Sequence, residues 1–186
     1  MVLNYKQIAE DARAFYNVGR LRVDEPSKWS IGYSSVPFWV NTAFACELYM
    51  KSIICYYNPG TTVEDLRKIS HYLDRLFEKL PEGVKREIRE QIPDLEIQNR
   101  EQRKNIGYRE LLSSDAPDDI KSIVKYELEN AVSTFDEALK KQANLFKDWR
   151  YLYEASAEKP ASCDEWFLYT FCNSLHNILV KIMTKE

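Results

Sequence analysis

The chain has 186 residues, of which 45% are hydrophobic and 30% charged, with only 5 glycines and 7 prolines. This balance is typical of one globular domain, here 1–186, and argues against a disordered protein. The net charge of −3 argues against a protein that binds nucleic acid over its whole surface, although a local basic patch stays open.

The amino-terminal segment predicts a first helix over about residues 4–23. Apolar side chains recur on one face of it, namely Ile8, Ala12, Phe15, Tyr16 and Val18. Charges occur throughout this segment and it has no apolar signal core, so we expect a cytoplasmic protein. The four cysteines form no CxxC or Cys/His zinc pattern, and we expect them to be reduced core residues.

The second predicted helix begins at Ser34 or Ser35 and ends near Tyr57, just before the breaker "NPG". It is apolar nearly all round, which predicts the central helix of a bundle. Although it is long enough to span a bilayer, Glu47 and Lys51 near its middle would each cost about 2.5–3.5 kcal/mol there. A buried helix, with no membrane contact, is therefore the better interpretation.

Shorter elements follow. Thr61-x-x-Glu64 has the spacing of a capping box and predicts a short helical turn, and Ser70 is a plausible cap for "SHYLDRLFEKL". After Pro81, "EGVKREIREQI" predicts an amphipathic helix. The polar segment at about 93–119 predicts a long connection with one helical turn.

The carboxyl-terminal part predicts two long helices. The first runs continuously from about Asp118 to Glu154, with Pro117 in its first turn. The second is "DEWFLYTFCNSLHNILVKIM", preceded by the capping-box spacing Ser162-x-x-Glu165. With no strand alternation anywhere, the predicted fold class is all-α, an antiparallel up-and-down bundle of about five main helices.

Polar residues inside apolar segments are the candidates for chemistry, because the familiar phosphate-binding and metal-binding motifs are absent. Glu47 and Lys51 are four residues apart and face the same side of their helix. His71 begins a helix, and Arg150, which lies between two aromatic residues, is the preferred partner of Glu47. These residues form either a structural network that fixes helix register or a site. His176 is interpreted as a packed or rim histidine.

Three segments, in this order, resemble the HEPN superfamily: 43–51 (A-x-E-x-x-x-K), 70–77 (S-H-x-L-x-x-L-F) and 150–154 (R-Y-x-Y-E). The resemblance implies a small antiparallel helical bundle, frequent homodimers, and roles in toxin–antitoxin, phage-defence and RNA-processing systems. It also implies, for catalytic members, a metal-independent endoribonuclease built on an R-x4-6-H motif. Here the nearest match is Arg67 before His71, with one intervening residue too few.

Three functional hypotheses follow from this resemblance. The first is a HEPN-like binding module that takes a nucleotide, an RNA or a partner protein such as a nucleotidyltransferase or antitoxin, without metal or cofactor. The second is a divergent endoribonuclease toxin that uses His71 with Arg67 or Arg150, and the third is a structural dimerisation module. The candidate polar cluster is Glu47, Lys51, His71, Arg150, Tyr153 and Glu154, and we expect a homodimer.

Overall fold

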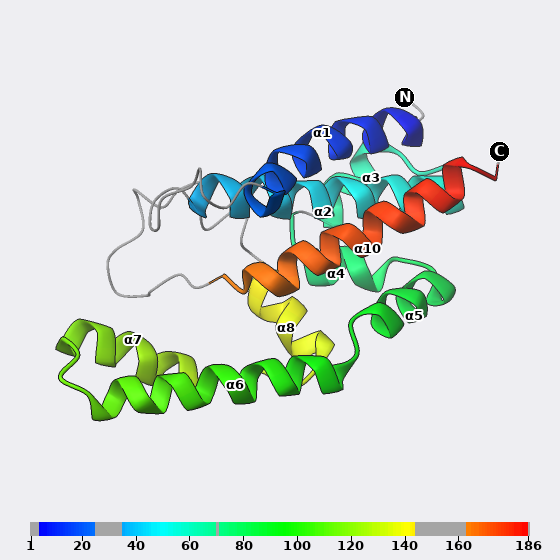
Figure 1. The fold of residues 1–186 in the computed structure, drawn as a ribbon. Helices are drawn as coiled ribbons and strands as arrows, with labels where there is room; N and C mark the ends of the chain where they lie inside the picture. Colours follow the sequence, from blue (N-terminus) through cyan, green and yellow to red (C-terminus); the bar gives the residue numbers. More distant parts are fainter. Residues whose placement is uncertain (1–3, 25–34, 70, 144–162, 186) are drawn as a thin grey trace.

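The computed structural model describes residues 4–24, 35–69, 71–143 and 163–185, which contain helices and no strand. The helices are α1 (Tyr5–Asp24), α2 (Ser35–Tyr57), α3 (Val63–Ile69), α4 (Leu73–Glu78), α5 (Glu82–Gln91), α6 (Asp94–Ser113), α7 (Asp118–Glu129), α8 (Phe135–Gln142) and α10 (Glu165–Met183) (Figure 1). The predicted all-α class is confirmed, whereas the count of about five main helices is not.

Three long helices, α1, α2 and α10, lie side by side, and α2 is the central one (Figure 1). The predicted bounds of α1 and α2 agree with the structure to within a residue or two. Small side chains let α1 and α2 approach closely, since Ala12, Ala43 and Ala45 are completely buried. No helix in the described ranges has the length and apolarity needed to cross a membrane.

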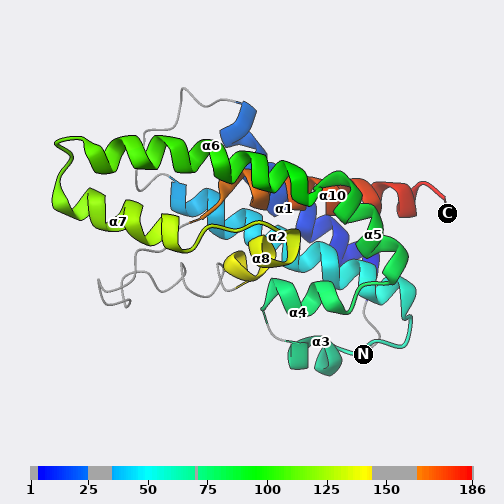
Figure 2. The same ribbon diagram turned by 90° about the horizontal axis from the view of Figure 1, so that it is seen from below.

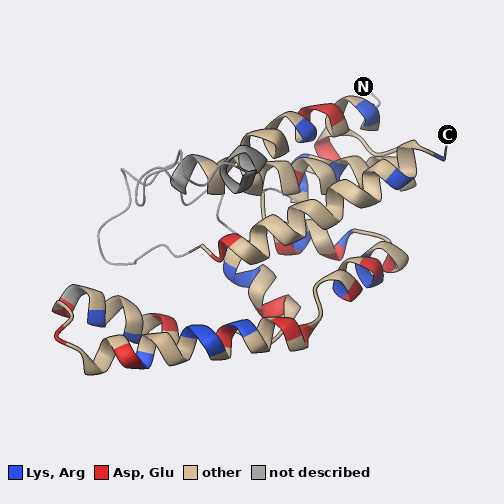
Figure 3. Cartoon of the chain, viewed as in Figure 1, with Lys and Arg blue, Asp and Glu red and all other residues tan. Residues whose placement is uncertain are grey.

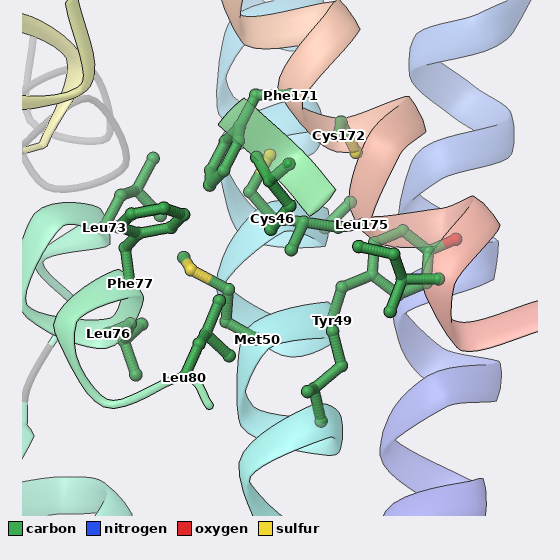
Figure 4. Packing of buried hydrophobic residues seen from close by; sticks show 14 of the residues in the cluster. Cys46, Tyr49, Met50, Leu73, Leu76, Phe77, Leu80, Phe171, Cys172 and Leu175 are labelled. Atoms are coloured by element: carbon green, nitrogen blue, oxygen red, sulfur yellow. The ribbon is translucent and has the colours of Figure 1, made fainter. Parts of the chain in front are cut away.

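The core lies where α4 and α10 meet α2 (Figure 4). Their contributions are Cys46, Tyr49 and Met50 from α2, Leu73, Leu76 and Phe77 from α4, and Phe171, Cys172 and Leu175 from α10. Burial raises the pKa of the Cys46 thiol well above its ordinary value, and neighbouring Cys172 raises it further. Cys46 is thus an unreactive packing residue.

The cap of α3 lies one residue later than predicted. Thr62 and Asp65, rather than Thr61 and Glu64, exchange the capping hydrogen bonds: Thr62 N donates to Asp65 Oδ2 at 3.0 Å, and Asp65 N donates to Thr62 Oγ1 at 3.3 Å. The bonds from the Thr62 hydroxyl and backbone lower the pKa of the Asp65 carboxyl. Ser70, the predicted cap of the next helix, lies outside the described residues.

The prediction of a long connection at 93–119 is wrong, because most of it forms the helix α6. The sequence of α6 has no apolar stripe that would predict a helix. Its buried residues are Ile97 and the charged Glu101, and the rest of the helix carries charges of both signs. α6 and α7 lie side by side as a helical hairpin, and α8 lies between this hairpin and the three long helices (Figure 1, Figure 2). The guanidinium of Arg100 stacks 4.1 Å from the ring of Trp166 and ties α6 to α10.

The single helix predicted from Asp118 to Glu154 is also wrong within its described part. α7 ends at Glu129, and α8 begins at Phe135 after a break. Thr134 causes the restart, because its hydroxyl accepts from Glu137 N while the Glu137 carboxylate accepts from Thr134 N, a complete capping box. Residues 144–162 lie outside the described part.

The last helix is capped by a residue other than the predicted one. Its N-cap is Asp164, whose Oδ1 accepts from Phe167 N at 2.9 Å. Ser162 lies outside the described residues and precedes this cap by two positions. A carboxylate at this place also favours the positive end of the helix dipole.

Candidate functional site

Glu47 is the centre of the candidate site, and it lies on the buried side of α2 with 1% of its surface exposed. The helix places Lys51 one turn later, so its ammonium donates to Glu47 Oε1 at 2.5 Å. Lys51 is itself mostly buried, with 14% of its side chain exposed. Such a carboxylate must be neutralised and hydrogen-bonded, since an isolated buried charge is very costly.

His71 supplies the second partner of Glu47. It lies between α3 and α4, and its Nδ1 is 2.9 Å from both carboxylate oxygens. An ionised carboxylate only accepts hydrogen bonds, so Nδ1 carries the proton and donates it. The side chains of Glu47, Lys51 and His71 therefore meet at one place in the structure.

The three side chains differ sharply in their access to solvent. Glu47 is closed off, whereas 47% of the His71 side chain is exposed. A buried acid thus orients an exposed imidazole, which is the arrangement that fixes one histidine tautomer at binding and catalytic sites. The ammonium of Lys51 adds a positive charge beside the pair.

Three of the remaining candidate residues lie outside the part of the chain that the structure describes. Arg150, Tyr153 and Glu154 lie outside the described residues, so the preferred Glu47–Arg150 pair stays a prediction. Arg67 lies on α3 with most of its side chain exposed, and its Nη1 donates to Glu64 Oε1 at 3.0 Å.

A groove of about 520 Å³ is lined by residues on either side of His71 in the chain. Its lining carries three cationic and two acidic side chains, in the set Asp65, Lys68, Ile69, Arg75, Glu78 and Lys79. The lining therefore carries one net positive charge, and one of its cations, Lys68, lies 4.0 Å from the Asp65 carboxylate. Arg75 also lies 4.4 Å over the ring of Tyr72, which presents a planar cation beside the groove.

His176 has a different role, and the interpretation as a packed histidine is confirmed. It stacks on Tyr16 with 4.7 Å between ring centres, and its Nδ1 lies 2.9 Å from the hydroxyl of Tyr49. Burial raises the pKa of the Tyr49 hydroxyl far above its usual value of 10, so it stays protonated and donates to Nδ1. Asn173 completes the arrangement by accepting from the Tyr16 hydroxyl.

A second buried charge cluster, which sequence reasoning missed, joins α6, α7 and α8. Glu127 is 4% exposed and accepts from Lys104 Nζ at 2.9 Å and from Lys141 Nζ at 3.1 Å. Glu101, also buried, lies 3.6 Å from Lys104. Burial lowers the pKa of Lys104, but the hydrogen bond and charge of Glu127 outweigh it and raise that pKa overall. The three-residue spacing of Glu101 and Lys104 could have indicated this charge cluster, but only if 94–113 had been predicted to be a helix.

Comparison with known proteins adds no relative to this geometry. No family model matches the chain, and no significant match was found among curated proteins or solved structures. Within the described ranges, no group of three or more His, Cys, Asp or Glu side chains is placed to hold a metal ion.

Proposed function

We propose that the protein is a HEPN-like helical bundle that binds a phosphate-bearing ligand, a nucleotide or an RNA, beside Glu47, Lys51 and His71. The observation that carries the proposal is the exposed imidazole of His71 held by a buried carboxylate. Both the resemblance of 43–51 and 70–77 to HEPN segments and the position of these residues support the assignment.

The groove beside His71 supplies the chemistry for the phosphate. Lys68, Arg75 and Lys79 place three cations along it, against the two carboxylates of Asp65 and Glu78. Arginine forks and lysine point charges are the usual partners of phosphate oxygens. Because this basic patch is local, it is compatible with a chain whose net charge is −3.

Fluorescence anisotropy tests the proposal with two probes at low salt, labelled single-stranded RNA and labelled ATP. We expect at least one probe to bind, with an affinity that falls as salt rises. Lys68→Ala and Arg75→Ala should each weaken binding about tenfold, the equivalent of one charged contact. His71→Gln should also weaken it, while circular dichroism stays unchanged.

Lys125→Ala is the matched control, since it removes one exposed lysine from α7, away from the groove. Failure of both probes to bind at low salt would overturn the proposal. So would an equal loss of affinity in Lys125→Ala and Lys68→Ala, because binding would then follow net charge and not this groove.

An endoribonuclease is the second candidate, and the orientation of His71 by Glu47 specifically favours it. With the proton held on Nδ1, the imidazole has its lone pair on Nε2, where it can accept the proton of a ribose 2′-hydroxyl. That oxygen then attacks the adjacent phosphorus to form a 2′,3′-cyclic phosphate, and the bond to the 5′-oxygen breaks as this oxygen takes a proton from water. Purified protein should cleave RNA without metal, and His71→Ala should abolish cleavage while keeping the fold. No cleavage at high enzyme concentration would eliminate this candidate.

A further inference from the structure

The short helix α4 keeps its apolar side chains apart from its charged ones. Leu73, Leu76 and Phe77 point into the core beside α2 (Figure 4). Both acidic and basic residues occur along the same helix (Figure 3). At about 100° per residue, Arg75 and Glu78 lie within about 60° of each other on the side that faces away from the core. Both line the groove to which α3 and α4 contribute.

Arg75 gives this groove a flat cationic surface. Its guanidinium lies 4.4 Å over the ring of Tyr72, which is half-buried and directly follows His71. Arg75 is exposed and forms no ion pair with a residue in the described ranges. A guanidinium that rests on a ring with one face offers the other face to a planar ligand, and nucleic-acid bases stack on such planes. The groove therefore contains a stacking platform next to His71.

Glu78 gives the groove a carboxylate that is open to a ligand. Its side chain is exposed, and within the part of the chain that the structure describes it forms no ion pair. The nearby Lys85 donates to the backbone oxygen of Glu78, while its ion pair is with Glu82. Asp65, the other acid of the lining, already accepts hydrogen bonds from the backbone and hydroxyl of Thr62.

An open carboxylate discriminates among the four RNA bases. It only accepts hydrogen bonds, and it does so through two neighbouring oxygens. Guanine presents two neighbouring donors, N1–H and the 2-amino group, on its Watson–Crick edge. Adenine and cytosine each have an acceptor nitrogen beside the amino group, and uracil has a carbonyl on either side of its N–H. Guanine alone can therefore donate to both oxygens without placing an acceptor against them.

We propose that this groove selects an unpaired guanine base, which stacks on the guanidinium of Arg75 while the Glu78 carboxylate accepts from N1–H and the 2-amino group. Lys68 and Lys79 then neutralise the attached phosphate. The volume of about 520 Å³ is in the range of small-ligand sites. The inference rests on the proposed function, because it names the base that the phosphate ligand of that site carries.

Isothermal titration calorimetry with mononucleotides tests the selection of the base. GMP should bind about tenfold more tightly than AMP, since a two-fold hydrogen-bonded contact separates them. IMP, which keeps N1–H but lacks the 2-amino group, should fall between the two. Glu78→Gln should remove the preference for GMP without weakening AMP. Glu64→Gln is the matched control, because Glu64 is an exposed acid on α3 outside the groove lining, and it should keep the preference.

A second pair of variants tests the stacking platform. Arg75→Lys keeps the positive charge but removes the planar group, so it should weaken GMP about tenfold. It should leave the affinity for ribose 5-phosphate, which has no base, unchanged. Tyr72→Leu should act in the same direction, because the guanidinium loses the ring that supports it. Circular dichroism should show the wild-type helix content for both variants.

These probes separate the guanine site from the phosphate site. Equal affinities for ribose 5-phosphate, AMP and GMP would overturn the guanine site and leave the phosphate site standing. A preference for GMP that persists in Glu78→Gln would also overturn it, and no binding of any probe would overturn both. Displacement of GMP by a single-stranded oligonucleotide with one guanine, but not by oligouridine, would support the guanine site and identify RNA as its source. Displacement by oligouridine alone to the same extent would contradict it.

Discussion

The Nδ1 atom of His71 lies 2.9 Å from each carboxylate oxygen of Glu47, across 24 residues of sequence. This contact joins the middle of the central helix α2 to the junction between α3 and α4. One of its partners is closed to solvent and the other is half open. It therefore serves as a structural tie and, in our proposal, as the base of a ligand site.

Glu47→Gln should lower stability clearly. The change leaves the Lys51 ammonium without its counter-charge and weakens the bond from His71. Hydrogen bonds to charged groups contribute about 2 kcal/mol, so we expect the melting temperature to fall by several degrees. Thermal denaturation followed by circular dichroism measures it.

Glu64→Gln is the control for that substitution, because the Glu64–Arg67 pair is equally an acid–base contact but is exposed on both sides. Its melting temperature should stay close to that of the wild type. If Glu47→Gln also left the melting temperature unchanged, the polar cluster could not be a network that holds α2 against the α3–α4 junction.

The capping box of α8 should make stability depend on pH in the acid range. Hydrogen bonds from Ser133 and Thr134 lower the pKa of Glu137 below its usual 4.5. A depressed folded-state pKa contributes stability that is present above the unfolded-state pKa and is lost as pH falls through the folded-state pKa. The difference in melting temperature between wild type and Glu137→Gln should therefore be largest near neutral pH and shrink below about pH 4. A difference that grows on acidification would contradict this assignment.

Tyr49 should make the protein sensitive to alkali. Burial raises its pKa above the usual 10, so the unfolded chain ionises first as pH rises. The contribution of Tyr49 to the free energy of unfolding is therefore complete below about pH 10 and decreases above it. Denaturant unfolding at increasing pH should show a steeper alkaline loss for the wild type than for Tyr49→Phe. At neutral pH, Tyr49→Phe should cost about 1 kcal/mol, because it removes one hydrogen bond to His176.

Glu127→Gln should destabilise the seam between α6, α7 and α8. It removes the charge that both Lys104 and Lys141 contact. We expect a loss of about 2 kcal/mol in the free energy of unfolding and a lower pKa for Lys104, which NMR titration can follow. Glu129→Gln, two residues away but exposed, should change neither quantity. Equal effects from both substitutions would mean that the seam is not held by this carboxylate.

Part of this site was predictable from sequence because polar residues in an apolar helix must find partners. The spacing of Glu47 and Lys51 puts them on one face, and His71 was a candidate because it begins a helix with apolar neighbours. The sequence favoured Arg150 as the partner of Glu47, so it did not single out the contact with His71. The pair of Tyr49 and His176 could not be predicted, since these residues are 127 positions apart and meet through packing that no local pattern encodes.

The errors have a common physical cause. In α6, the buried positions include Glu101, which pairs with Lys104, so a charge pair takes the place of apolar periodicity and the helix resembles a loop in sequence. In the predicted helix after Asp118, the break was marked only by Thr134 and Glu137. Their capping spacing was masked by apolar residues on both sides of the break, which continue a helical rhythm.

The break before Thr134 separates α7 from α8, so the α6–α7 hairpin can open without unwinding α8. Among the described residues, the main core cluster takes Ile97 from the start of α6 and nothing from α7. We therefore expect the hairpin to open to solvent more readily than α1, α2 and α10. Amide hydrogens along α7 should exchange with solvent much faster than those of α2. A chain built this way can open this hairpin without disturbing the helix that carries Glu47.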